Sequence, residues 1–196
     1  MISKFRIGVL VIILNFFASV AMIWGQDNPS LLQMAVPSLN IAPDARGGGM
    51  GDMGAATLPD INSQYWNAAK YAFMGSKAGV SLSYTPWLRK LVNDVALVNM
   101  TGYYKLGNSD LQAISASLRY FSLGEVNIWE NIGDVPYGLN PYEMAFDVAY
   151  SRKLSESYSM AVTLRYIRSD MGTDQNDESN AGNAFSADIS GYLEKY

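Results

Sequence analysis

The clearest chemical pattern in this chain is a glycine-rich stretch that reads GGGMGDMG over residues 47–54. Within it, Gly49, Gly51 and Gly54 have the G-x-G-x-x-G spacing of dinucleotide-binding loops. That spacing binds a pyrophosphate only where a buried strand leads into it and a helix begins at it. Here no apolar strand pattern precedes the glycines, and Pro59 follows them closely. We therefore interpret the run as a place where the backbone packs closely against other groups.

The absence of cysteine and histidine from the 196 residues limits the chemistry open to the chain. It removes thiol nucleophiles, Ser-His triads, disulfides and most zinc or haem sites. The formal net charge of −4 argues against nucleic acid as a partner. The acidic stretch with Asp170, Asp174, Asp177 and Glu178 lacks EF-hand spacing, so we interpret it as a solvated loop. We expect no enzymatic activity, no catalytic residue, no cofactor and no metal.

The N-terminus has the features of an export signal. Lys4 and Arg6 precede an apolar run over residues 7–24, and small residues at Ala21 and Gly25 offer cleavage sites. We predict a signal peptide over residues 1–25. The alternative is a single membrane anchor, because the run approaches the length of a spanning helix.

Residues 26–77 show no sustained periodicity, because proline and glycine recur and interrupt any helix or strand. A structureless segment of this length is either disordered or packed inside a larger structure. Its methionine and aromatic content favours packing.

From residue 78 onward the sequence alternates between apolar and polar residues, as in Val80-Ser81-Leu82-Ser83-Tyr84. Period-2 alternation is typical of strands with one buried face. Several of the segments approach ten residues, about the length of a tilted membrane-spanning strand. The segments are six in number and are centred on residues 80–84, 95–105, 114–120, 144–150, 160–166 and 185–189.

The connections between these segments alternate between longer and shorter, over residues 86–93, 107–110, 125–140, 155–157 and 170–182. Outer-membrane barrels combine short periplasmic turns with longer external loops in this way. Tyrosines and tryptophans near the strand ends fit interfacial girdles, although ordinary strand propensity also explains a single tyrosine. We predict an all-β fold, an antiparallel outer-membrane β-barrel whose strands occupy residues 78–196.

Five stretches carry a resemblance to one known family: IAPDARGGGMG at 41–51, WNAAKYAF at 66–73, GVSLSYTPWLRKL at 79–91, SASLRYFSLG at 115–124 and DVAYSRKL at 147–154. Together they resemble the PorV family, also called LptO, over about residues 41–196. The first two stretches are shared more widely among FadL-like barrels. The stretches SYTPWLRKL and LRYFSLGE are the ones specific to PorV.

The resemblance implies a FadL-like 14-stranded barrel with an N-terminal plug, here residues 26–77, in the outer membrane of a Gram-negative bacterium. It implies a shuttle of type IX secretion that binds the C-terminal signal domain of exported cargo and carries it from translocon to cell-surface attachment complex. Cargo, translocon and attachment proteins and outer-membrane lipid would be its partners. Because only six strands are present and open sheet edges are not tolerated in lipid, we expect the N-terminal part of a longer barrel.

Three groups of residues follow as candidate sites. The candidate plug-packing residues are Pro43, Asp44, Arg46, Gly47, Gly49, Met50, Gly51, Trp66 and Asn67. The candidate partner-contact residues lie in the first loop and are Trp87, Leu88, Arg89, Lys90 and Leu91. The candidate polar residues of the lumen are Arg119, Asp147, Arg165 and Asp188.

Each group leaves alternatives open. The first loop is a protein contact or a loop tip in the membrane interface, since tryptophan and lysine suit both. We interpret the polar lumen residues as a salt-bridge network that holds the plug, rather than as catalytic carboxylates. We expect Asp44 to cap a short turn and Arg46 to pair with Asp147 or Asp188, or else to be solvated. The alternative function is a FadL-type channel for hydrophobic small molecules.

Overall fold

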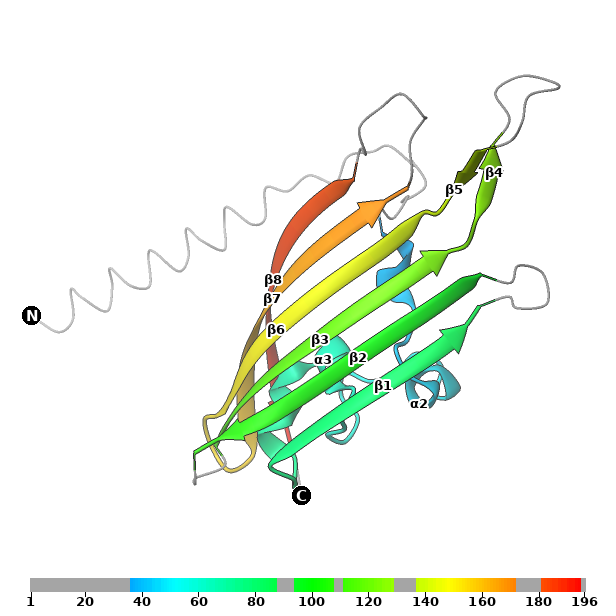
Figure 1. Ribbon diagram of the computed structural model, residues 1–196. Helices are drawn as coiled ribbons and strands as arrows, with labels where there is room; N and C mark the ends of the chain where they lie inside the picture. The colour runs from blue at the N-terminus through cyan, green and yellow to red at the C-terminus, as the bar shows by residue number, and fades with distance from the viewer. Residues whose placement is uncertain (1–35, 88–93, 108–110, 129–136, 172–180, 195–196) are drawn as a thin grey trace, which may run out of the picture. The chain divides into compact units, whose positions relative to one another are not determined.

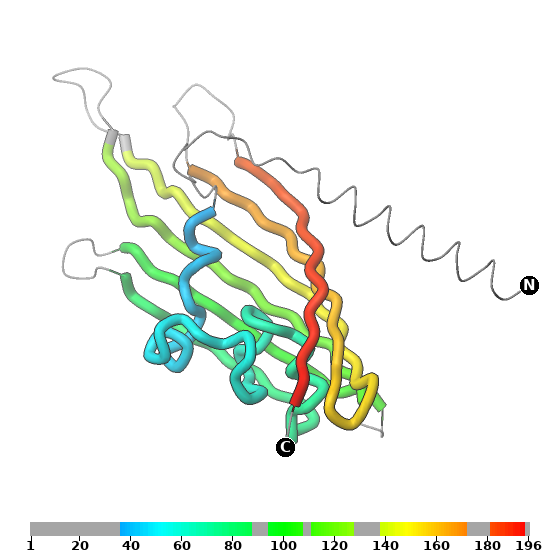
Figure 2. The backbone as a smooth tube through the Cα atoms, turned by 180° about the vertical axis from the view of Figure 1, so that it is seen from behind, coloured from blue at the N-terminus to red at the C-terminus, as the bar shows by residue number. Residues whose placement is uncertain are grey.

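The computed structural model describes residues 36–87, 94–107, 111–128, 137–171 and 181–194, so the predicted signal peptide lies outside the described residues. These residues form a curved six-stranded antiparallel sheet with an irregular N-terminal segment against its concave face (Figures 1 and 2). The strand order is β1-β2-β3-β6-β7-β8. The sheet is open, with β1 and β8 at its edges. The strands are β1 (Ala78–Pro86), β2 (Val95–Leu106), β3 (Gln112–Leu123), β6 (Tyr142–Lys153), β7 (Tyr158–Asp170) and β8 (Gly182–Leu193).

Strict alternation along each strand gives the sheet two chemically different faces. One cross-strand row joins Leu82, Met100, Leu118 and Phe146, all of them exposed on the convex face. The neighbouring row, shifted by one residue, joins Ser83, Asn99, Arg119 and Ala145 on the concave face. Because side chains of successive strand residues point to opposite faces, the predicted pattern fixes which side chains meet the N-terminal segment. The antiparallel all-β prediction is confirmed for the described strands.

Two ends of the sheet differ in their connections. We call the end that carries the turns after β2 and β6 the short-turn end; Gly107, with a φ of 72°, lies in the first of these turns. We call the opposite end, where the chain passes from β1 to β2, β3 to β6 and β7 to β8, the long-loop end. The connection predicted as a loop over residues 125–140 carries a small hairpin, β4 (Val126–Ile128) paired with β5 (Tyr137–Leu139). A strand of three residues is too short to be predicted from the periodicity of the sequence.

The N-terminal segment, residues 36–77, consists of short helical turns joined by irregular chain. They are η1 (Pro37–Asn40), α2 (Ala45–Gly49), α3 (Ser63–Trp66) and η2 (Ala68–Phe73). The carboxylate of Asp44 caps α2 by accepting a hydrogen bond from Gly47 N at 3.1 Å, as predicted. No helix among the described residues has the length and apolar character needed to cross a bilayer.

The segment crosses the concave face once, from the long-loop end to the short-turn end (Figure 2). At the long-loop end, Ser38 N donates to Glu143, the second residue of β6. At the short-turn end, Ala69 O accepts from Ser159, the second residue of β7. The segment then passes directly into β1 at the short-turn end. The N-terminal side of the segment therefore lies nearest the long connections.

The apolar core lies where η2 meets the sheet at the short-turn end. The ring of Tyr71 is fully buried and stacks on Tyr103 of β2, with ring centroids 4.9 Å apart. The core consists of Ala68, Ala69 and Tyr71 from η2 and Tyr103, Ala113, Ala149, Ala161 and Tyr192 from the strands. Alanines at the strand positions leave space for η2 to approach the sheet, because a larger side chain would occupy that volume.

The glycine run packs closely at only two positions. A Cβ at Gly47 would lie 3.1 Å from the Trp66 ring, and one at Gly54 would lie 2.3 Å from it. By contrast, Gly48, Gly49 and Gly51 have no group within 4 Å of such a Cβ, so close packing is the wrong interpretation there. These glycines lie in α2 and the turn after it, where the chain is exposed. Gly51 is required instead for its φ of 75°, which side chains other than glycine adopt at a cost.

Candidate functional site

The most buried charged groups of the concave face lie at the long-loop end, where they hold η1. Arg119 of β3 is 4% exposed and Glu143 of β6 is 1% exposed. Arg119 Nη1 donates to Ser38 O at 2.6 Å and to Ile41 O at 2.9 Å. Glu143 Oε2 accepts from Ser38 N at 2.9 Å. The two strands thus hold both main-chain groups of one residue, Ser38, between opposite charges.

Tyr65 of α3 completes this arrangement from within the segment. Its hydroxyl donates to Leu39 O at 2.7 Å, and the guanidinium carbon of Arg119 lies 4.4 Å from its ring centroid. Burial raises the pKa of Tyr65 above the ordinary value. The hydroxyl therefore stays protonated and remains a donor through the physiological range.

A second polar cluster lies on the neighbouring strands. Arg165 Nε contacts Asp147 Oδ1 at 2.6 Å, and Arg165 Nη1 lies 3.7 Å from Asp188 Oδ2. Ser117 also donates to Asp147 Oδ2 at 3.0 Å. The structure therefore brings together three of the four predicted lumen residues as an ion cluster, while Arg119 binds the N-terminal segment instead.

Arg46 does not pair with an acid of the sheet, which corrects the expectation for this residue. Its Nη1 contacts Asp60 Oδ2 at 2.9 Å, within the N-terminal segment itself, and its side chain is about half exposed. The reason is local: α2 and residue 60 belong to one folded unit, so the nearest carboxylate is only 14 residues away along the chain. Asp147 is occupied by Arg165 and Ser117.

At the short-turn end the sheet holds the segment through hydroxyl and amide groups. Ser159 Oγ donates to Ala69 O at 2.7 Å, and Ser115 Oγ donates to Gln64 Oε1 at 2.6 Å. Asn67 caps η2 by accepting from Ala69 N at 3.0 Å, and its Nδ2 reaches Gly191 O of β8 at 3.0 Å. Asn67 therefore ties η2 to the last described strand.

Lys70 lies among the apolar residues of η2 and is 0% exposed. Its Nζ donates to Gly54 O at 2.9 Å and to Thr57 Oγ1 at 3.1 Å. Burial lowers the pKa of this amine below the ordinary value. Lys70 thus fastens the loop around Gly54 to η2.

Several of these residues were missed by sequence reasoning, among them Glu143, Lys70, Gln64 and Tyr65. Glu143 was detectable, because period 2 places it on the same face of β6 as Asp147. No local pattern identifies Lys70, Gln64 or Tyr65, since their roles depend on groups distant in sequence.

The remaining candidates of the plug group lie in or around α2 and α3. Pro43 is buried, and its carbonyl oxygen accepts from the Ser83 hydroxyl of β1. Met50 is partly buried and ends α2. Trp66 covers Gly47 and Gly54 within the segment.

Of the predicted contact loop, only Trp87 is described. Its side chain is 39% exposed, and its backbone N–H donates to Val95 O at 2.9 Å, which extends the β1–β2 pairing by one step. Leu88, Arg89, Lys90 and Leu91 lie outside the described residues. Most of the predicted acidic loop lies outside them as well.

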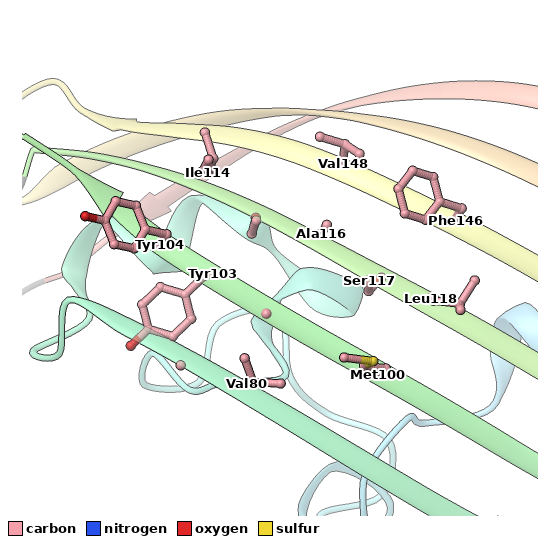
Figure 3. A pocket seen from close by; sticks show the side chains of 13 residues that line it. Val80, Met100, Tyr103, Tyr104, Ile114, Ala116, Ser117, Leu118, Phe146 and Val148 are labelled. Carbon is pink, nitrogen blue, oxygen red and sulfur yellow. The ribbon is translucent and has the colours of Figure 1, made fainter.

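Two of the hollows formed by described residues lie in different parts of the structure. The larger, about 510 Å³, is lined by residues of β1, β2, β3 and β6, among them Met100, Ala116, Leu118 and Phe146 (Figure 3). The second, about 470 Å³, lies within the segment beside Trp66. Through the described parts of the chain, no group of three or more carboxylates is arranged to hold a metal ion. The contacts of the concave face described above are made to main-chain and side-chain groups of the N-terminal segment.

A comparison with protein-family models adds a finding from outside the structure. The model described as "Type IX secretion system protein PorV" matches residues 25–195. The match covers the whole N-terminal segment and all described strands. A search of curated proteins finds no match.

Proposed function

The chain belongs to the PorV family of type IX secretion system proteins, and from this we propose how it takes part in secretion. The family acts at the bacterial outer membrane as a component of this system. We propose that the protein binds the C-terminal signal domain of exported cargo and carries it from the translocon to the cell-surface attachment complex. The family match over residues 25–195 is the observation that carries the proposal.

The character of the two faces supports a membrane-embedded binding protein. The convex face exposes large apolar side chains along every strand, which suits contact with lipid. The concave face is lined by serine, threonine, asparagine and charged side chains, many of them bonded to the N-terminal segment. A polar face that is already covered by the N-terminal segment offers little room for the passage of hydrophobic solutes. This favours the shuttle over the channel.

We propose that the first loop, starting at Trp87, contacts a protein partner. Replacing Trp87 with alanine removes an indole that, if buried in a partner, contributes about 2 kcal/mol or more, roughly thirtyfold in affinity. We expect Trp87→Ala and Arg89→Glu to reduce cargo co-purification and surface display in cells while assembly in the membrane stays normal. Tyr84→Ala is the matched control, because Tyr84 is an exposed aromatic on the convex face of β1, the strand that leads into the loop.

Two results would count against this proposal. If cargo co-purification and display are unchanged in both loop variants, the loop does not contact cargo and the membrane-interface interpretation stands. If the wild-type protein itself retains no cargo under mild detergent extraction, the shuttle role is wrong.

One feature favours the channel as a second candidate. The hollow beside Trp66 is lined mainly by small or apolar side chains, including Met53, Ala55 and Ala56, and would suit a hydrophobic solute. The test is uptake of a long-chain fatty acid by cells that carry or lack the protein. Equal uptake by both would leave only the shuttle.

A further inference from the structure

Arg119, Glu143 and Tyr65 bind main-chain atoms of three residues, Ser38, Leu39 and Ile41. Ser38 is bound through its N–H and its carbonyl, and Leu39 and Ile41 through their carbonyls. The binding groups are Arg119, Glu143 and Tyr65, which we call the cradle. A site that binds main-chain atoms accepts any peptide of the same conformation, because every residue type except proline carries the same donor and acceptor.

The cradle also has unused hydrogen-bonding capacity. Arg119 Nη2 and Glu143 Oε1 are buried, and neither has a hydrogen-bond partner among the described residues. Both side chains are more than nine-tenths buried. Burying a charged group without satisfying all of its hydrogen bonds costs free energy. These two atoms therefore favour a ligand that supplies one further acceptor and one further donor. A peptide main chain supplies both.

Few interactions stabilise residues 38–41, which occupy the cradle in this structure. Residues 37–40 form a single 3-10 turn that has no side-chain cap, and they contribute nothing to the apolar core at the short-turn end. The core residues of η2 hold the rest of the segment independently of this turn. Residues 38–41 are therefore placed to leave the sheet while η2 stays, because local opening follows the elements with few apolar contacts.

The position of the cradle suits a ligand that arrives from outside the cell. Glu143 is the second residue of β6, and Arg119 lies in the half of β3 nearest the long-loop end. In outer-membrane proteins of this kind the longer connections are external. A peptide presented at the cell surface reaches this end of the concave face first.

We propose that the cradle is a binding site for peptide main chain, filled here by residues 38–41 and taken by a turn of the same main-chain conformation in the cargo signal domain when those residues leave. The proposal rests on the proposed shuttle function and names the site at which that function begins. Residues 38–41 then act as an internal competitor that occupies the cradle while no cargo is bound.

The test titrates the purified full-length protein in detergent with the isolated C-terminal signal domain of a cargo from the same bacterium. Ser38→Pro removes the N–H that Glu143 binds and so weakens the internal competitor. Loss of one hydrogen bond to a charged group predicts cargo binding that is tighter by about tenfold to a hundredfold. Arg119→Met releases residues 38 and 41 but also removes Nη2, which is unpaired now and which only cargo would use, so cargo binding should weaken about tenfold.

Ser159→Ala is the matched control, because it removes a side-chain bond to a main-chain carbonyl of the segment outside the cradle. We expect it to leave cargo affinity unchanged. Folding of Arg119→Met is checked by its thermal unfolding, and Ser38→Pro gives an independent result if that variant does not fold. Equal affinities for wild type and Ser38→Pro would overturn the cradle while leaving the shuttle intact. An absence of binding to the wild-type protein would overturn both.

Discussion

The two ends of the N-terminal segment differ in the main interaction that attaches them to the sheet. At the short-turn end, Tyr71 and the alanines of η2 are buried against alanines and tyrosines of the strands. At the long-loop end, Arg119 and Glu143 hold a single turn through hydrogen bonds to its backbone. Apolar burial contributes in proportion to area and is hard to replace, whereas a hydrogen bond can be exchanged for one to another partner. The difference suggests one permanent attachment and one exchangeable attachment.

The largest effect is expected at the permanent end. Replacing Tyr71 with alanine removes a fully buried ring that stacks on Tyr103, so we expect a loss of about 3–5 kcal/mol in stability. Thermal unfolding in detergent measures the loss. The control Tyr71→Phe keeps the ring and loses only the hydroxyl bonds to Ile61 O and Gln64 N, with a smaller expected loss of about 1–3 kcal/mol. Equal losses in the two variants would mean that packing does not dominate this end.

A smaller and local effect is expected at the exchangeable end. Replacing Glu143 with alanine leaves Ser38 N without its acceptor, at an expected local cost of about 1–3 kcal/mol. Hydrogen exchange should become faster at residues 38–41 and stay unchanged at Ala69 and Tyr71. Faster exchange spread evenly over both ends would show that the two attachments open together, and the comparison would fail.

The buried amine of Lys70 gives the permanent end a pH dependence. Because its folded-state pKa lies below the unfolded value of 10.5, burial of the charged amine destabilises the fold fully below the folded pKa. This penalty disappears as the pH rises through the window between the folded pKa and 10.5. The wild-type protein should therefore gain stability relative to Lys70→Met as the pH rises toward 10.5, as measured by denaturant unfolding of both. A difference that stays constant with pH would contradict the effect of burial.

The smallest effect is expected for Arg46, which binds neither end of the sheet. Its ion pair with Asp60 is exposed, and such pairs contribute about 0–1 kcal/mol. Arg46→Ala should change the unfolding temperature little, and Arg46→Lys should be indistinguishable from wild type. A loss as large as that of Tyr71→Phe would mean that α2 is part of the permanent attachment.

Much of the sheet could be predicted from the sequence because the decisive signal is local. The alternation in Val80-Ser81-Leu82-Ser83 predicts which side chains share a face, and this prediction does not depend on which strand pairs with it. The same logic placed Asp147 and Arg165 on one face, where they form an ion pair. The cap at Asp44 is also local, since it involves Gly47 only three residues away.

The tertiary structure alone decided what the faces hold. Arg119 binds Ser38, which is 81 residues away in the sequence, and Ser159 binds Ala69, which is 90 residues away. The periodicity within a strand therefore predicts neither contact. Arg46 pairs with Asp60 of the same segment, and the sequence offered no means of choosing this acid over those of the sheet. The sequence by itself determined the strands and their two faces, since side-chain direction repeats every two residues along a strand. Which groups of the segment those faces bind depended on how the segment crosses the sheet, and that path is set by the burial of Tyr71 and its neighbours at one end.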